Sequence, residues 1–132
     1  MAETAKKKIL IVDDEPDVSL FLKTLFEDEG YAAVTAENGR VGFESARKNN
    51  PDMITLDVTM PEESGVRMYR DLKDDEVLKK IPVIIITGLG EPMKNFISTR
   101  RQVPAPEGFI SKPIDKDELL KAAREILARP KS

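Results

Sequence analysis

Short apolar segments alternate with longer amphipathic segments along almost the whole chain. Five of the short segments have the length and composition of strands, and they cover residues 9–12, 32–36, 53–56, 83–86 and 109–110. The first and the fourth are unbroken aliphatic runs, a pattern that is typical of strands buried on both faces of a parallel sheet. The second and the fifth are weaker and are predicted to be edge strands.

The amphipathic segments predict five helices. The first begins at Pro16, and its apolar residues form one helical stripe of Val18, Phe21, Leu22, Leu25 and Phe26. Three others are expected at residues 39–48, from residue 64 onward, and at 92–100, while residues 74–80 either continue the third helix or form a loop. The last helix has the clearest start, because Asp115 is placed to cap it and Glu118 completes a capping box.

This alternation predicts an α/β fold of the doubly wound (βα)5 type, a three-layer sandwich in which helices cover both faces of a parallel sheet. We expect one domain over residues 8–128, a flexible N-terminal segment at 1–7 and a C-terminal tail at 129–132. Residues 101–107 contain two prolines and fit neither a regular helix nor a central strand, so we expect a long loop there.

Composition and charge exclude several classes of function. The chain has 132 residues, a net charge of −3 and a pI of about 5.1, which argues against direct binding of nucleic acid. It has no cysteine and no histidine, which excludes disulfides, zinc–thiolate sites, imidazole metal ligands and Ser-His catalytic pairs. No apolar run approaches the ~18 residues of a membrane span. No secretory signal is recognisable, so we expect a cytoplasmic protein.

Polar residues follow four of the five predicted strands directly. Asp13 and Asp14 follow the first strand, Asp57 the third, Thr87 the fourth and Lys112 the fifth. Ligands of an open parallel sheet bind at the carboxyl ends of its strands. We therefore expect three carboxylates, one hydroxyl and one ammonium to lie together at one edge of the sheet.

Three carboxylates in one pocket repel one another, by roughly 3 kcal/mol per pair at ~6 Å and an effective dielectric constant of about 20. Lys112 supplies one compensating charge, and a small set of hard oxygen ligands suits Mg²⁺. A carboxylate nucleophile, a metal, a lysine and a hydroxyl are the parts that phosphoryl transfer needs. Taken singly, each residue has a simpler explanation: a helix cap for Asp13 and Asp14, a solvated strand end for Asp57, and a surface lysine for Lys112.

Four strings at these strand ends resemble those of the receiver domains of two-component response regulators, the chemotaxis-regulator-like family. They are ILIVDDE at residues 9–15, LD at 56–57 with MP at 60–61 and a glycine at 65, ITG at 86–88, and FISKP at 109–113. Each string alone is weakly specific, but four in order at strand ends are highly specific, and the similarity covers roughly residues 7–128. The resemblance implies a flavodoxin-like fold with a five-stranded parallel sheet in the order 2-1-3-4-5.

The resemblance also assigns roles to the acidic residues. Asp57 stands at the position that accepts a phosphoryl group from a sensor histidine kinase or a phosphotransfer protein. Asp13, Asp14 and Asp57 would bind Mg²⁺, with Asp14 as the principal acidic ligand, and Thr59 would contribute its backbone carbonyl. The domain would act as a signalling phosphoacceptor rather than as an enzyme, in the form of a monomer or a weak homodimer.

Thr87 and Lys112 would contact the phosphoryl group, and the bond between Lys112 and Pro113 is cis in the family. Phe109 occupies the position of the family's switch aromatic. In the family, the threonine moves toward the phosphoryl group and the ring turns inward, which remodels the face formed by the fourth helix, the fifth strand and the fifth helix. An output partner, which the sequence does not identify, would bind this face.

Three alternatives compete with this interpretation. A receiver-like interaction module that acts without phosphorylation is the main one, and the complete set of acidic residues with Thr87 and Lys112 argues against it. A dinucleotide-binding loop at residues 88–90 lacks the third glycine and follows the wrong strand. A phosphatase of the haloacid dehalogenase type needs a second aspartate where Thr59 stands.

Two features depart from the family pattern. The separation of Thr87 and Lys112 is a few residues longer than usual, in the stretch that contains residues 101–107. Thr59 and Leu89 occupy rim positions that tune the lifetime of the phosphoryl group, and neither orients an attacking water, so we expect a phosphorylated form that lives for minutes or longer. The sequence leaves open whether the chain is a single-domain regulator or the receiver part of a longer protein.

Overall fold

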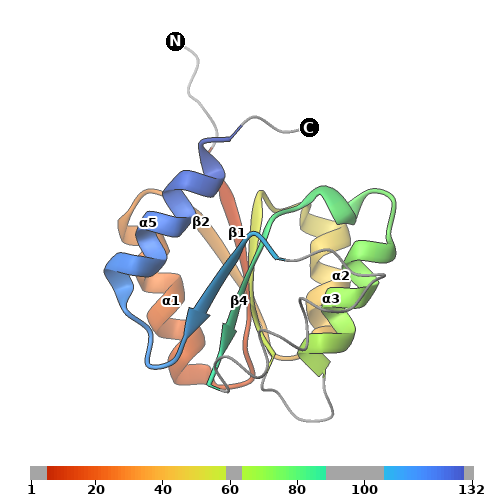
Figure 1. Ribbon diagram of the computed structural model, residues 1–132, viewed down its shortest axis with the longest axis horizontal. Coiled ribbons are helices and arrows are strands. Elements are labelled where there is room, and N and C mark those ends of the chain that lie inside the picture. Colours follow the sequence, from red (N-terminus) through yellow and green to blue (C-terminus); the bar gives the residue numbers. More distant parts are fainter. Residues whose placement is uncertain (1–5, 59–63, 89–105, 130–132) are drawn as a thin grey trace.

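The computed structural model describes residues 6–58, 64–88 and 106–129 of the chain. Its centre is a five-stranded sheet in the order β2-β1-β3-β4-β5, with every neighbouring pair parallel (Figure 1). The strands are β1 (Lys8–Val12), β2 (Ala32–Ala36), β3 (Met53–Asp57), β4 (Val83–Thr87) and β5 (Gly108–Ser111). The predicted doubly wound α/β fold and its strand order are confirmed, and the two weaker segments form the two edges.

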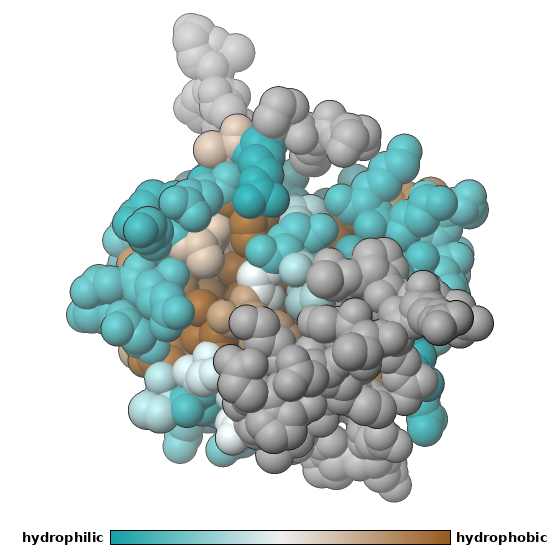
Figure 2. Space-filling view, in the orientation of Figure 1, coloured by the Kyte–Doolittle hydropathy of each residue, from teal (hydrophilic) through white to brown (hydrophobic). Residues whose placement is uncertain are grey.

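Helices cover both faces of the sheet. On one side lie α1 (Pro16–Asp28) and α5 (Lys116–Leu127), and on the other lie α2 (Gly39–Asn49) and α3 (Ser64–Asp74) (Figure 1). Asp115 caps α5 as predicted, because its side chain accepts the backbone N–H groups of Asp117 and Glu118. Figure 2 shows hydrophobic residues along the inner side of α5 and hydrophilic residues on its outer side, which is the pattern of a helix packed on a sheet.

The two helical layers create two hydrophobic cores. In β1, Leu10 and Val12 point to the α2–α3 side, whereas Ile9 and Ile11 point to the α1–α5 side, and all four are at most 1% exposed. The alternation follows from the two-residue period of a strand. This explains why the central strands read as unbroken aliphatic runs instead of alternating ones.

Two sequence expectations change at the helices. Leu22 and Phe26 of α1 are buried, but Phe21, which belongs to the same predicted apolar stripe, is 45% exposed. The stripe prediction was wrong there because α1 packs on one narrow face only. The charged stretch after α3 contains a short 3-10 helix, η2 (Leu78–Lys80), rather than a continued α-helix. The helix expected at 92–100 and most of the 101–107 loop lie outside the described residues.

The register of the sheet brings the carboxyl ends of the central strands to one level. Val12 pairs with Leu56, Asp57 with Ile86 and Thr87 with Ser111. Asp57 and Thr87 are the last residues of their strands, and Lys112 follows β5 directly, its N–H donating to the Thr87 carbonyl. Among the described residues, no helix is both long and apolar enough to cross a membrane.

Candidate functional site

Four acidic side chains converge where β1 and β3 end. Asp13, Asp14 and Glu15 follow β1, and Asp57 ends β3, the strand that pairs with β1. One carboxylate oxygen from each of the four lies within 4.8 Å of the others. Asp13 and Asp57 are buried, whereas Asp14 and Glu15 are exposed at the rim. The parallel pairing of β1 with β3 therefore produces this cluster, as the sequence predicts for three of its members.

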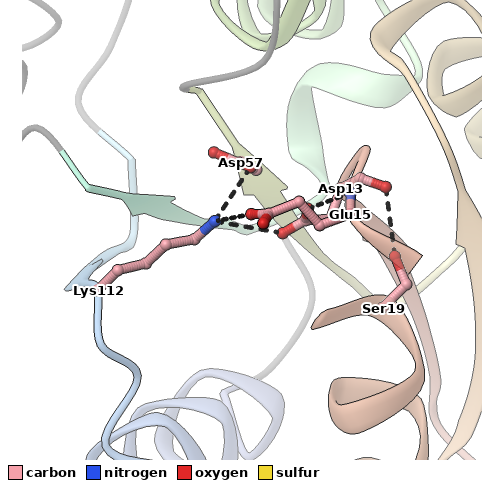
Figure 3. Close-up of polar contacts among 5 residues, drawn as sticks. All are labelled: Asp13, Glu15, Ser19, Asp57 and Lys112. Atoms are coloured by element: carbon pink, nitrogen blue, oxygen red, sulfur yellow. Dashed lines mark hydrogen bonds and ion pairs between the residues drawn. The ribbon is translucent and has the colours of Figure 1, made fainter. Parts of the chain in front are cut away.

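The side chain of Lys112 reaches into the cluster from the end of β5 (Figure 3). Its Nζ lies 3.1 Å from Oε1 of Glu15, 3.3 Å from Oδ2 of Asp57 and 3.8 Å from Oδ2 of Asp13. The ammonium thus faces three carboxylates. In the sheet, β5, which precedes Lys112, and β1, which precedes the other acidic residues, lie on opposite sides of β3 and Asp57. Glu15 is not among the predicted site residues, and the run of three consecutive acidic residues that it completes is the signal that could identify it.

Hydrogen bonds to the backbone hold the acidic loop of residues 13–15 in place. Oδ1 of Asp13 accepts the N–H of Glu15 at 2.9 Å, and the Asp13 carbonyl accepts the hydroxyl of Ser19 at 3.3 Å (Figure 3). The N–H of Asp13 donates to the carbonyl of Ala36 at the end of β2. The next residue after this loop is Pro16, which starts α1. Asp13 is therefore held by β2 and α1, and its Oδ2 is the oxygen that faces the Lys112 ammonium.

The backbone around Asp57 is tightly packed as well. A Cβ atom on Gly65, near the start of α3, would overlap the carbonyl oxygen of Asp57 and lie 2.7 Å from Cα of Val58. Only glycine permits α3 to begin this close to the end of β3. The packing of α3 therefore sets the position of the Asp57 backbone.

Burial and like charge raise the pKa of Asp13. Its pKa rises from 3.8 to about 6, chiefly because burial penalises the charged form and further because of the Asp57 carboxylate, while the hydrogen bond from Glu15 opposes the shift. Burial alone would lower the pKa of Lys112, but the hydrogen bond to Glu15 and the charges of Asp57 and Asp13 outweigh it, so its pKa is raised. At neutral pH the cluster is an excess of negative charge held around one ammonium.

The donor set fits a hard divalent cation. Oδ2 of Asp13 is buried and accepts no hydrogen bond from any residue that the structure describes, so a polar atom that normally needs a partner points into the cluster. Carboxylate oxygens in small number, two of them at an open rim, suit Mg²⁺ with retained waters. Thr59, whose carbonyl is the expected further ligand, lies outside the described residues, as does Leu89.

Thr87 and Phe109 lie on one face of the sheet. Ile85 pairs with Phe109 and Thr87 pairs with Ser111, so the side chains of Thr87 and Phe109 are diagonal neighbours on adjacent strands. Thr87 is fully buried, and Phe109 is partly buried against the α2–α3 core. The expected cis bond between Lys112 and Pro113 is present.

Comparison with known proteins identifies the family. The model of the response regulator receiver domain family matches residues 9–124. The chain is 34% identical to Protein PilH of Pseudomonas aeruginosa over 121 residues, and this match covers 92% of this chain and 98% of PilH. It is 36% identical to the polar-differentiation response regulator DivK of Brucella anthropi over 122 residues, and this match covers 92% of this chain and 96% of DivK.

Solved structures agree with these matches. The chemotaxis protein CheY4 of Vibrio cholerae superposes with a TM-score of 0.81 at 27% identity, over 92% of this chain and 99% of CheY4. The receiver domain of a Francisella response regulator gives a TM-score of 0.80 at 27% identity, over 92% of this chain and 97% of that domain. With a 2-1-3-4-5 sheet and an acidic cluster at its carboxyl edge, the chain belongs to the response regulator receiver domain family, the signalling modules of two-component systems.

Proposed function

We propose that this chain accepts a phosphoryl group on Asp57 from a phosphohistidine of a sensor histidine kinase or a phosphotransfer protein. One observation carries the proposal: the Asp57 carboxylate is buried at the end of β3, 3.3 Å from the Lys112 ammonium, within an acidic cluster. Several carboxylates gathered around one ammonium weaken a fold, because their mutual repulsion and their desolvation are only partly offset. The arrangement has a function if the carboxylates bind a divalent cation and the Lys112 ammonium pairs with a phosphoryl group on Asp57.

The transfer needs a nucleophile and a means to balance charge. A carboxylate oxygen of Asp57 attacks phosphorus, an O–P bond forms, and the N–P bond breaks with its electron pair returning to the imidazole. Asp13, Asp14 and Asp57, with the carbonyl of Thr59, would hold Mg²⁺, which neutralises charge on the phosphoryl oxygens when bound. Lys112 would pair with the phosphoryl group from the β5 side.

Glu15 and the phosphoryl group compete for Lys112. The Nζ of Lys112 is 3.1 Å from Glu15, a side chain that is 60% exposed, and 3.3 Å from Asp57. A phosphoryl group on Asp57 brings charge-assisted acceptors to this ammonium, which are stronger than a solvated carboxylate at the rim. Glu15 then turns into solvent at little cost, because surface ion pairs are weak.

Output would follow from Thr87 and Phe109. A phosphoryl group at Asp57 offers an acceptor to the buried Thr87 hydroxyl, and any shift of this side chain changes the space beside its diagonal neighbour Phe109. We infer that the surface of β5 and α5, together with the helix that the sequence predicts at residues 92–100, changes in this way and binds the output partner.

The phosphodonor would dock beside α1. Leu20 and Phe21 are 64% and 45% exposed on this helix, and a hollow between α1 and the loop after β5 is lined by Phe21, Lys112 and Pro113. A partner that brings a histidine to Asp57 covers this apolar surface. Phe21→Ser should therefore slow transfer from a phosphorylated kinase domain and leave transfer from acetyl phosphate unchanged; equal slowing of both reactions would contradict this docking surface.

Phosphorylation of Asp57 can be tested by mass spectrometry of the intact chain. Incubation with acetyl phosphate and millimolar Mg²⁺ should add one phosphoryl group to the wild-type chain and none to Asp57→Asn. Asp71→Asn, an exposed aspartate on α3, is the matched control and should react like wild type. A wild-type chain that stays unmodified with this donor and with phosphorylated kinases would favour the interaction module that acts without phosphorylation.

Metal binding has a separate readout. Millimolar Mg²⁺ should raise the melting temperature of the wild-type chain, because a ligand that binds only the folded state stabilises it. Asp13→Asn removes one of the two buried carboxylates and should remove most of this shift. If Mg²⁺ raised the melting temperature of the wild-type chain and of the variant equally, the metal would bind outside the acidic cluster.

A further inference from the structure

A second pocket lies at the opposite end of the sheet from the acidic cluster. It has a volume of about 330 Å³, within the range that accommodates small organic ligands. Segments that precede β1, β3, β4 and β5 line it, together with the end of α5. In Figure 1 this is the upper end of the molecule, where β1 starts and α5 ends. The site proposed for Asp57 shares no residue with it.

The floor of this pocket is apolar. Ile81, Ile126 and Leu127 line it and are each at most 9% exposed, so their side chains are fixed by the core on which they pack. Val77, at the mouth, is 68% exposed, more than any other large hydrophobic side chain among the described residues. A bound apolar group would remove this surface from water.

The rim of the pocket is cationic. Lys7, Lys80 and Arg129 line it, and none of the three forms an ion pair with a carboxylate in the described part of the chain. Other basic side chains, such as Lys23, do have such partners. Three unpaired cations around one apolar floor favour an anionic ligand.

Two carboxylates also line the pocket, but both already bind backbone amides. Oδ2 of Asp52 accepts the N–H of Lys8 at 2.8 Å, and Oε1 of Glu107 accepts the N–H of Val83 at 2.8 Å. Each hydrogen bond holds one oxygen of the carboxylate at the start of a strand. The three basic side chains are exposed and outnumber these two carboxylates, so the lining of the pocket carries a net positive charge.

We propose that this pocket binds an organic anion that carries an apolar group: the apolar group rests on Ile81, Ile126 and Leu127, and the anionic group meets Lys7, Lys80 and Arg129. The ligand would bind at the start of β4 and β5, at the opposite end of the sheet from Asp57. Glu107 links these two strands there, since its N–H also donates to the Val83 carbonyl at 3.0 Å.

The probe for this proposal is anilinonaphthalene sulfonate, an aromatic anion of suitable size, titrated into the complete chain. Fluorescence should saturate with one site, and amide shifts in NMR spectra should map to residues 77–82, 107 and 126–129. The uncharged analogue phenylnaphthylamine, which lacks the sulfonate, should bind more weakly. Shifts centred elsewhere, binding that does not saturate, or equal binding of the neutral analogue would overturn the proposal.

Charge reversal at the rim supplies the variant test. Lys80→Glu combined with Arg129→Glu should raise the Kd of the probe about tenfold, because two attractions become repulsions at exposed positions. Lys121→Glu, an exposed lysine of α5 that does not line the pocket, is the control and should leave the Kd unchanged. An unchanged Kd in the double variant would exclude the rim as the anion site. Asp57→Asn and millimolar Mg²⁺ should not affect the probe, which separates this result from the proposal for Asp57.

Discussion

The two ends of the sheet carry opposite charge arrangements. At the carboxyl end, four carboxylates form one cluster, two of them are buried, and three of the four face the Lys112 ammonium. At the amino end, three exposed cations surround an apolar pocket and have no ion-pair partners within the described residues. Buried charges interact strongly and depend on geometry, whereas exposed charges are screened by water and salt. Substitutions at the carboxyl end should therefore change stability and chemistry together, and substitutions at the amino end should change ligand binding alone.

The largest effect is expected for Gly65→Ala, which tests whether the carboxyl end depends on backbone packing. The new Cβ would overlap the Asp57 carbonyl, so α3 must shift away from β3. We expect a loss of about 2–4 kcal/mol in unfolding free energy and a loss of Asp57 phosphorylation. Gly88→Ala, at the same edge, adds a Cβ that would meet no atom within 4 Å among the described residues, so it should change the unfolding free energy by no more than about 0.5 kcal/mol when both variants are measured by urea titration. Similar losses in both variants would contradict the packing argument.

Lys112→Met tests whether charge balance holds the carboxyl end together. Removal of the ammonium leaves Asp13 and Asp57 with uncompensated negative charge, so we expect a loss of about 2–3 kcal/mol at pH 8 in EDTA. Mg²⁺ at the proposed site should recover part of this loss, because it would neutralise the same carboxylates. Lys121→Met, on the outer side of α5, should have little effect. If both methionine variants lost the same unfolding free energy, the charge of Lys112 would have no special role at the carboxyl end.

Asp13→Asn should raise stability in a pH-dependent way. The pKa of Asp13 is raised from 3.8 to about 6, so between these values the folded protein keeps a proton that the unfolded chain has lost. Wild-type stability therefore falls as the pH rises through this window, and the penalty stays constant above it. In EDTA the variant should be more stable than wild type by about 1–2 kcal/mol at pH 8 and equally stable below pH 4. Urea titrations across this range that show a constant difference would refute the assignment.

The smallest effect is expected at Thr55, in β3 between the two ends of the sheet. Its hydroxyl is buried and has no hydrogen-bond partner in the described part of the chain. Thr55→Val removes this unpaired group at nearly constant volume, so stability should rise by about 1 kcal/mol at every pH, with or without Mg²⁺. Thr35→Val, at an exposed position of β2, is the control and should be neutral in thermal melts. A gain that depends on Mg²⁺ would link Thr55 to the metal site.

The fold class and most of the site at the carboxyl end follow from the sequence. Unbroken aliphatic runs required a sheet covered on both faces, and polar residues directly after the strands required a site at their carboxyl ends. Asp13, Asp14, Asp57 and Lys112 were predicted to lie together and do so, because the distance between parallel strands is set by backbone hydrogen bonds alone. Residues that follow paired strands can therefore be placed without knowledge of their side-chain packing.

Contacts between side chains of different helices and strands could not be predicted in this way. Glu15 reaches Lys112 because α1 starts one residue later, and the exposure of Phe21 depends on how little of α1 the sheet covers. The pocket at the amino end collects residues from five separate segments that share no motif or spacing. Such contacts depend on side-chain directions and on the packing of helices against the sheet, which the periodicity of one chain does not specify.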